Sequence, residues 1–238
     1  MFNPPVARVL ITGSSAGLGA ALAASYRAKG WEVQGLSRRD PVWPCDLADP
    51  AQVARLVSDP GKLSGFDLAV FAAGTSEVGL LEDLPPEAFR RCLEVNFLAP
   101  ITLFRALAAA PRPCRRFVFV LSGAAEVLAP GLSPYAVGKR ALKDYLAFRG
   151  LERAYPDVRI LCVWPGPMAT GFDAATRVHG NWRLRSASSP RSPEEVARRV
   201  LEAEEAGRRR LVLSPLACLV GRLQSLAPGL IGALMRRR

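Results

Sequence analysis

Three side chains in this sequence have the types and the spacing for acid–base chemistry: Ser122, Tyr135 and Lys139. Tyr135 and Lys139 are four residues apart, a spacing that puts both side chains on one face of a helix. An ammonium beside a phenol favours the phenolate, so we expect Lys139 to lower the pKa of Tyr135 from its ordinary value of about 10. Such a tyrosine can give a proton to a carbonyl oxygen or take one from an alcohol. Taken alone, the spacing more often marks an exposed lysine beside a half-buried tyrosine, so the rest of the chain has to decide.

The elements that would position these side chains are strands followed by ligand-binding turns. Ser122 ends the apolar run 116–122, which predicts a buried strand, and the carboxyl edge of an open α/β sheet is where ligands bind. Near the amino terminus, the largely β-branched run 6–11 predicts another strand, and the helix formers of 20–29 predict a helix. A glycine-rich turn joins the two.

The glycines of this turn are suited to a dinucleotide. They let the backbone approach a pyrophosphate, and the first turn of the following helix offers unpaired N–H groups to an anion. The spacing is Gly-x-x-x-Gly-x-Gly rather than Gly-x-Gly-x-x-Gly, and the alternative is a tight turn without a ligand. The residues expected around the cofactor phosphates are Gly13, Ser14, Ser15, Gly17, Leu18 and Gly19.

The end of the next predicted strand, in the run 31–37, indicates which cofactor is bound. An acidic residue there would accept the ribose hydroxyls of NAD. This sequence has Ser37 followed by Arg38 and Arg39, and two guanidiniums suit a bidentate grip on a 2′-phosphate. We therefore expect NADP(H) in preference to NAD(H). In the alternative, the two arginines are merely solvated, because arginine is frequent throughout the chain.

With these motifs in view, the chain resembles the short-chain dehydrogenase/reductase family over roughly residues 6 to 215. The family's motifs occur in order: the glycine turn, an adenine-contacting Asp-Leu pair, an Ala-Gly pair, a helix-borne asparagine, the Ser and Tyr-x-x-x-Lys set, and a Pro-Gly-x-x-x-Thr turn. The offset of 13 residues between Ser122 and Tyr135 is the family's usual one. Beyond the glycine turn, the matching residues are Asp46, Leu47, Ala73, Gly74, Asn96, Ser122, Tyr135, Lys139, Pro165, Gly166 and Thr170.

The resemblance implies hydride transfer between a nicotinamide and a carbonyl or carbinol carbon. Tyr135 would be the general acid for reduction and the base for oxidation, and Ser122 would hydrogen-bond the substrate oxygen. Lys139 would hold the nicotinamide ribose. Asn96 would hold a water of a proton relay; in the alternative, its amide is satisfied by backbone in the core. The other cofactor contacts implied are Ser37, Arg38, Arg39, Asp46, Leu47, Ala73, Gly74, Pro165, Gly166 and Thr170, with Asn96, Tyr135 and Lys139 contributing as well.

One segment departs from the family pattern. Phe71 and Ala72 replace both asparagines of the family's Asn-Asn-Ala-Gly, which braces the sheet and borders the adenosine. We expect weaker hydrogen bonding there, and no effect on the reacting atoms.

The leading hypothesis is an NADP(H)-dependent oxidoreductase that interconverts a small-molecule carbonyl and an alcohol. A β-ketoacyl carrier-protein reductase is a variant, because a basic surface suits an acidic carrier. The alternatives are a cofactor-binding redox sensor or scaffold protein without turnover, and a peripheral membrane reductase of lipid-derived carbonyls. The presence of all four catalytic residue types argues against a sensor.

Alternating strands and helices along 238 residues predict an α/β fold, a Rossmann-type doubly wound parallel sheet in three α/β/α layers. We expect a single domain over residues 1–214, with a helix in 193–205 and the last strand in 210–213. Residues 171–191 have no clear period and are expected to form the substrate loop. Phe172, Trp182 and Leu184 in it are candidates for an apolar pocket wall or for ordinary packing.

Residues 215–238 form an unusual tail. Its apolar spacing is helical, Pro228 divides it, and three arginines close it at 236–238. The tail would pack on a neighbouring subunit, cover the substrate pocket, or lie on an anionic membrane surface with its apolar side down. The family resemblance implies a homodimer or homotetramer.

Composition narrows the function further. The net charge is +11, but arginine is scattered and no aromatic-interleaved basic motif occurs, so nucleic-acid binding is not expected. Five single cysteines and one histidine lack metal-ligand spacing, so we expect no metal site and reduced thiols. No apolar run reaches about 18 residues without a charge, so no spanning helix is expected. The expected location is cytoplasmic, or membrane-peripheral through the tail.

Overall fold

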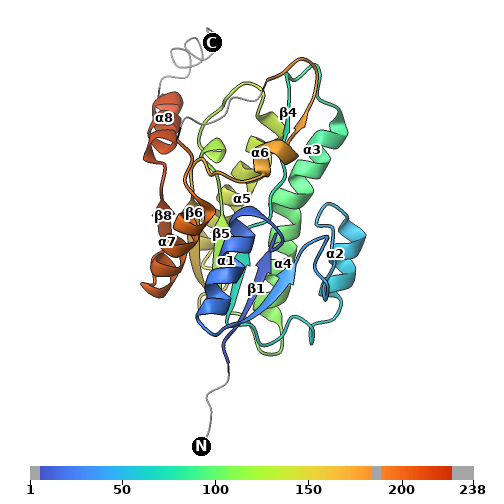
Figure 1. The fold of residues 1–238 in the computed structure, drawn as a ribbon, viewed down its shortest axis with the longest axis vertical. Coiled ribbons are helices and arrows are strands. Elements are labelled where there is room, and N and C mark those ends of the chain that lie inside the picture. Colours follow the sequence, from blue (N-terminus) through green and yellow to red (C-terminus); the bar gives the residue numbers. More distant parts are fainter. Residues whose placement is uncertain (1–5, 184–188, 227–238) are drawn as a thin grey trace, which may run out of the picture.

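The computed structural model describes residues 6–183 and 189–226. Its centre is a six-stranded sheet with the order β2-β1-β3-β5-β6-β8 (Figure 1). Every neighbouring pair in it is parallel. The strands are β1 (Arg8–Thr12), β2 (Glu32–Leu36), β3 (Leu68–Phe71), β5 (Arg116–Val120), β6 (Arg159–Trp164) and β8 (Arg210–Val212).

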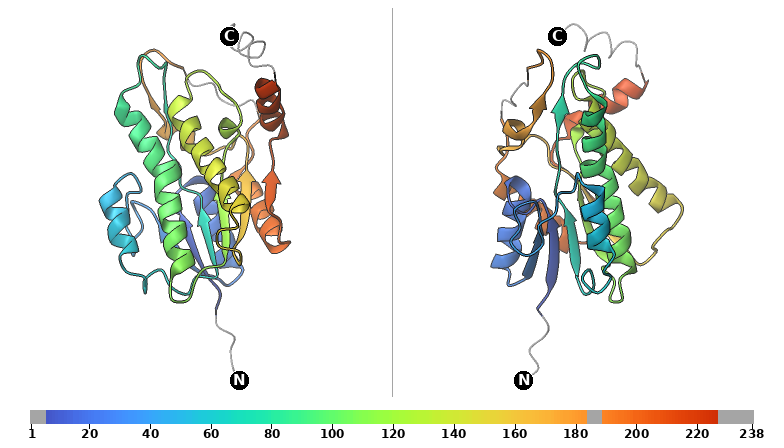
Figure 2. Two further views of the ribbon diagram at one scale, coloured as in Figure 1. Left: turned by 180° about the vertical axis from the view of Figure 1, so that it is seen from behind. Right: turned by 90° about the vertical axis from the view of Figure 1, so that its right-hand side faces the viewer.

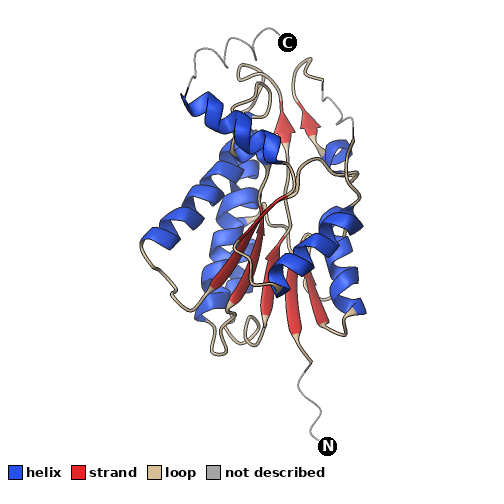
Figure 3. Cartoon of the chain, turned by 90° about the vertical axis from the view of Figure 1, so that its left-hand side faces the viewer, coloured by secondary structure: helices blue, strands red, loops and turns tan. Residues whose placement is uncertain are grey.

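Helices cover both faces of the sheet and give three layers (Figures 2 and 3). One face packs against α1 and α7, and the other packs against α2, α4 and α5. This arrangement confirms the predicted doubly wound fold, including the helix expected in 193–205 and the strand expected near 210. The helices are α1 (Gly17–Ala28), α2 (Pro50–Val57), α3 (Pro86–Leu93), α4 (Ala99–Ala109), α5 (Ser133–Leu151), α6 (Phe172–Ala175), α7 (Pro193–Glu205) and α8 (Pro215–Leu226).

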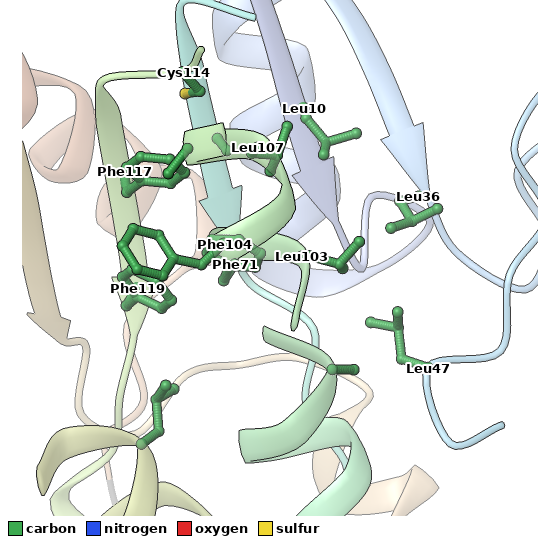
Figure 4. Close-up of a cluster of buried hydrophobic side chains, with 14 of the residues drawn as sticks. Leu10, Leu36, Leu47, Phe71, Leu103, Phe104, Leu107, Cys114, Phe117 and Phe119 are labelled. Atoms are coloured by element: carbon green, nitrogen blue, oxygen red, sulfur yellow. The ribbon is translucent and has the colours of Figure 1, made fainter. Parts of the chain in front are cut away.

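The strands read as continuous apolar runs because both of their faces are buried. In the core cluster of Figure 4, Phe104 of α4 packs edge-on against Phe117 of β5, with ring centroids 4.8 Å apart. Phe71 stacks on Phe119 at 4.6 Å in the same cluster. Phe71, which replaces the first asparagine of the family's Asn-Asn-Ala-Gly, therefore places an aromatic ring in the core. Aromatic packing takes the place of the asparagine's hydrogen bonds there.

The strand order reverses between β1 and β3. The chain runs from β1 outward to β2 and then crosses back to β3 on the other side of β1. Thr12 and Phe71, at the ends of β1 and β3, are register partners. The turns that follow these two strands therefore meet at a topological switch point, where open α/β sheets bind ligands.

Above this edge lies a second, two-stranded parallel sheet of β4 (Glu77–Val78) and β7 (Arg177–Val178). It ties the substrate loop, which also contains α6, to the segment that follows β3. The sequence of this loop has no clear period, so this pairing was not predicted. Residues 184–188 of the loop, including Leu184, lie outside the described residues, as do residues 227–238 of the tail.

One long helix runs from Pro86 to Ala109 through α3, η1 (Glu94–Leu98) and α4, and η1 is π-helical. By length and composition, this 24-residue helix could cross a membrane. Half of its most apolar stretch is buried, however, and Leu103, Phe104 and Leu107 pack in the main core cluster. We therefore interpret it as a core helix that carries Asn96.

Candidate active site

Ser122 and Tyr135 meet above the carboxyl end of β5. Ser122 follows β5 and caps a short 3₁₀ turn, its hydroxyl accepting a hydrogen bond from the amide of Ala124 at 3.1 Å. Tyr135 lies in the first turn of α5, after Pro134, which suits a helix start. Burial raises the pKa of Tyr135, and a hydrogen bond with the side chain of Ser122 lowers it by less. The phenol is therefore held in its protonated form.

Lys139 lies one turn further along α5 and is buried, with 4% of its surface exposed. Its Nζ donates a hydrogen bond to the carbonyl oxygen of Val120, the last residue of β5, at 2.8 Å. Burial lowers the pKa of Lys139 to about 8. Within the two described stretches of the chain, no carboxylate lies at ion-pair distance from this ammonium.

The effect that we expected of Lys139 on Tyr135 is wrong for this structure. The pKa of Tyr135 is raised, not lowered, because the loss of solvent outweighs the favourable interactions. The group that favours the phenolate is Ser122 rather than Lys139, whose Nζ donates to the strand backbone. A protonated phenol beside a lysine that loses its proton near pH 8 suits proton donation to a carbonyl oxygen.

Asn96 is fully buried in the π-helical turn η1. Its Nδ2 donates to the carbonyl oxygen of Thr75 at 2.8 Å, and its Oδ1 accepts from the amide of Thr75 at 3.3 Å. These bonds match the alternative that the sequence left open, an amide satisfied by backbone. A Cβ on Gly74 would lie 3.3 Å from Asn96 Oδ1 and 3.8 Å from Lys139 Nζ, so both polar atoms face one point beside the turn after β3.

The glycine-rich turn has the close backbone approaches that a dinucleotide site needs. Gly13 has φ +71°, and a Cβ there would lie 2.8 Å from the Cα of Ala73. A Cβ on Gly19 would collide with the carbonyl group of Gly13. The N-cap of α1 is Ala16, which has no side chain to bond the first helical amides, so these donors are available to an anion. Leu18 is buried in the core, so only its backbone can contact a phosphate.

At the end of β2, Ser37 is buried and its hydroxyl accepts from the amide of Arg39 at 3.3 Å. Arg38 and Arg39 are exposed, as a grip on a phosphate requires. We overlooked Asp40 in the sequence. A Cβ on Gly35 would collide with the Asp40 carboxylate and would lie 2.5 Å from Ser14 Oγ, so a carboxylate shares the space beside this predicted phosphate contact.

Asp46 and Leu47, the predicted adenine contacts, have structural roles here. Asp46 Oδ1 accepts from the amide of Ala48 at 3.0 Å and shapes the turn before α2. Leu47 is buried in the main core cluster. Their side chains therefore hold the turn, and their backbone is the part left to face a nucleotide.

The turn from Pro165 to Thr170 lies against the glycine loop. Gly166 has φ +75°, and a Cβ there would lie 2.7 Å from the Cβ of Ser214. A Cβ on Gly17 would lie 3.3 Å from the Thr170 side chain. Thr170 Oγ1 accepts from the amide of Phe172 at 3.2 Å, and the Phe172 ring lies 5.6 Å from the Tyr135 ring. The predicted substrate loop thus packs against Tyr135.

A buried carboxylate that the sequence did not single out anchors this loop. Glu77 of β4 is 3% exposed. It contacts Arg91 Nε at 3.1 Å, Arg177 Nη1 at 3.9 Å and His179 Nε2 at 2.9 Å. Arg177 and His179 belong to the substrate loop, so Glu77 joins that loop to α3. Among the residues that the structure describes, no cluster of potential metal ligands occurs.

Comparison with known proteins bears on this site. The family model for short chain dehydrogenases matches residues 7–180. A curated relative, Dehydrogenase/reductase SDR family member 7B of Bos taurus, is 28% identical over 261 residues, covering 97% of this chain and 80% of the relative.

Solved structures show the same fold. A short-chain dehydrogenase from Streptomyces avermitilis has a TM-score of 0.78 at 23% identity over 96% of both chains. One from Sphingobium yanoikuyae in complex with NADPH has a TM-score of 0.75 at 18% identity, over 96% of this chain and 95% of the other. One from Burkholderia phymatum in complex with NAD has a TM-score of 0.72 at 20% identity, over 97% and 96%. Similarity at these identities establishes the fold alone.

Proposed function

We propose that this chain, which belongs to the short-chain dehydrogenase/reductase family of NAD(P)-dependent oxidoreductases, is an NADP(H)-dependent carbonyl reductase. The observation that carries the proposal is the raised pKa of Tyr135, a buried phenol hydrogen-bonded with Ser122 at the carboxyl edge of the sheet. A phenol that keeps its proton is the group needed when a carbonyl oxygen becomes an alcohol. We therefore favour reduction as the direction at neutral pH.

In this proposal each residue has one task. A bound nicotinamide supplies the hydride. Ser122 hydrogen-bonds the substrate oxygen and holds it beside the Tyr135 hydroxyl, which donates the proton. Lys139, with a pKa of about 8, returns a proton to the tyrosine. Asn96 fixes the segment after β3 through Thr75, and the free lone pair of its Oδ1 is the place for a relay water.

The residues also fit the cofactor along its length. The uncapped start of α1 and the glycine turn suit the pyrophosphate, and the exposed guanidiniums of Arg38 and Arg39 suit a 2′-phosphate. Asp40 opposes that preference. We propose that the two arginines outweigh it, because a charge-assisted arginine–phosphate bond contributes about 1.5 to 3 kcal/mol.

A fluorescence titration with NADPH and NADH, followed by turnover on aldehydes, ketones and a β-ketoacyl thioester, tests the proposal. The wild type should bind NADPH at least tenfold more tightly than NADH and turn over at least one substrate. R38A/R39A should lose the preference with NADH binding unchanged. The matched control is R198A/R199A, which removes two neighbouring arginines of α7 that pair with glutamates on their own helix.

The outcomes separate the candidate functions. Equal affinity for the two nucleotides in the wild type would refute the NADP(H) preference while leaving the reductase. Tight binding without turnover would favour the sensor or scaffold alternative, and turnover confined to the thioester would favour the carrier-protein variant.

Assembly and location follow from the same proposal. The family is typically oligomeric. Exposed apolar side chains on η1 and α5, among them Leu98, Val137 and Phe148, support a homodimer or homotetramer built on the helices that carry Asn96 and Tyr135. Light scattering of the purified protein tests this. We propose a cytoplasmic enzyme, with the surface described next as its route to a membrane.

A further inference from the structure

Helix α8 is attached to the protein directly beside the site. Ala217 packs on Gly123, where an added Cβ would lie 2.7 Å from the alanine methyl, and a Cβ on Gly221 would collide with the backbone of Glu126. Gln224 forms a hydrogen-bond pair with the backbone of Leu128, accepting from its amide at 2.8 Å and donating to its carbonyl at 3.0 Å. One face of α8 is therefore fixed to the segment that follows Ser122.

The opposite face of α8 consists of leucines. Leu216, Leu219, Leu223 and Leu226 are 69%, 55%, 46% and 83% exposed. At 100° per residue these four positions fall within about 80° of one another, on the side away from Ala217, Gly221 and Gln224. Leu128, joined to α8 through Gln224, is another leucine with 62% of its surface exposed. The leucine face (Leu216, Leu219, Leu223 and Leu226) is thus a continuous apolar stripe.

The charged residues of the tail that contains this stripe are all of one sign. Residues 215–238 contain four arginines, at 222 and 236–238, and no acidic residue, and the whole chain has a net charge of +11. An apolar stripe in a segment whose only charged residues are basic is the pattern of a helix that lies in the surface of an anionic bilayer. A second copy of the chain is a poorer occupant, because it would bring like charges together. Four leucines also cover well under the roughly 800 Å² per partner that a stable dimer buries.

We propose that the leucine face of α8 docks on an anionic lipid bilayer and holds the Ser122 edge of the sheet toward that surface. The leucines enter the boundary of the headgroups and acyl chains, while Arg222 and the positive net charge of the chain attract anionic headgroups. The proposal concerns a surface and stands independently of the reaction. It selects the membrane from the three roles that the sequence left open for the tail.

The test is flotation of the full-length protein with vesicles of phosphatidylcholine alone and with phosphatidylglycerol added at one lipid in four. We expect at least tenfold more protein bound to the anionic vesicles than to those of phosphatidylcholine alone. Less protein should be bound at 0.5 M salt than at 0.1 M salt, because salt screens the arginines. L219E/L223E should lower the bound fraction about tenfold. The matched control is V6E/V42E, which changes two exposed valines away from α8 and should stay within twofold of the wild type.

Thermal melts and light scattering complete the test. Both variants change exposed side chains, so their melting temperatures should match that of the wild type. Absence of wild-type binding, or equal binding by L219E/L223E, would overturn the proposal. A smaller particle mass for L219E/L223E than for the control would overturn it too, because the face would then bind a second copy.

Discussion

The buried ammonium of Lys139 should make the free energy of unfolding depend on pH in a way that one substitution can isolate. The pKa of Lys139 falls from 10.5 to about 8 in the folded protein because of burial. Between these two pH values the unfolded chain binds the proton and the folded protein releases it. The unfolded state therefore carries more protons, and the contribution of Lys139 to stability rises with pH across this window.

The size of the effect follows from the same two pKa values. At pH 7 the folded protein holds a charged ammonium at a cost of about 3 kcal/mol, and at pH 10 less than about 1 kcal/mol of that cost remains. K139M removes the charge and keeps the length of the side chain. It also removes the hydrogen bond to Val120, a loss that is the same at every pH to first order. The stability of the wild type relative to K139M should therefore rise by 2 to 3 kcal/mol, roughly, from pH 7 to pH 10.

Urea unfolding of the wild type and K139M at four pH values between 7 and 10 measures this difference. The matched control is K143M, one turn further along α5, which removes an ammonium that pairs with Glu126 at 3.1 Å. A wild-type-minus-K139M difference that stays within about 0.5 kcal/mol across the range would refute the reasoning, because the folded protein would then not penalise the ammonium.

Three further predictions concern the site. Y135F should lower kcat at least 100-fold and leave NADPH affinity within twofold of the wild type, because only the proton donor is removed. Steady-state kinetics measure kcat and a fluorescence titration measures the affinity. Retention of a tenth of the wild-type activity would contradict this prediction. G19A should weaken NADPH binding more than tenfold and lower the free energy of unfolding in urea by about 1 to 3 kcal/mol, since its Cβ would collide with the backbone. The control G150A lies in α5 with open space around it and should raise the free energy of unfolding by about 0.5 to 1 kcal/mol. D40N should tighten NADPH binding about fivefold and NADH binding by less, because it removes a negative charge beside Ser14 and NADPH carries one phosphate more than NADH; weaker NADPH binding would show that the carboxylate helps instead.

The sequence predicts the sheet and the positions of Ser122 and Tyr135 because those features depend on local patterns. Apolar runs mark the buried strands, and Ser122 and Tyr135 come directly after a strand and at the start of a helix. The direction of the Tyr135 pKa shift could not be predicted in this way. It depends on how many atoms surround the hydroxyl, which is a property of the packed protein and not of the spacing to Lys139.

Three other features could not be predicted from the sequence. Strands β4 and β7 have two residues each, too few for any alternation to appear. Glu77 follows the segment 74–76, which has no pattern, and its three partners, Arg91, Arg177 and His179, come from two distant segments. Asp40 is 26 residues from Ser14 in the sequence, and only the folded turn brings its carboxylate beside that hydroxyl.

The π-helical turn that carries Asn96 also sets how this chain can change in length. Ala88 and Leu107 are both buried, and 19 residues separate them, whereas five turns of an α-helix would take 18. The surplus residue is accommodated in η1. Deleting one residue between 94 and 98 would leave 18 residues for the five turns, so a regular helix could form with α3 and α4 in the same rotation. Leu103, Phe104 and Leu107 would then stay in the core, whereas a deletion elsewhere between 86 and 109 would rotate one part of the helix against the other by about 100°. Natural variants of this chain should therefore lose a residue within 94–98 more readily than elsewhere along this helix.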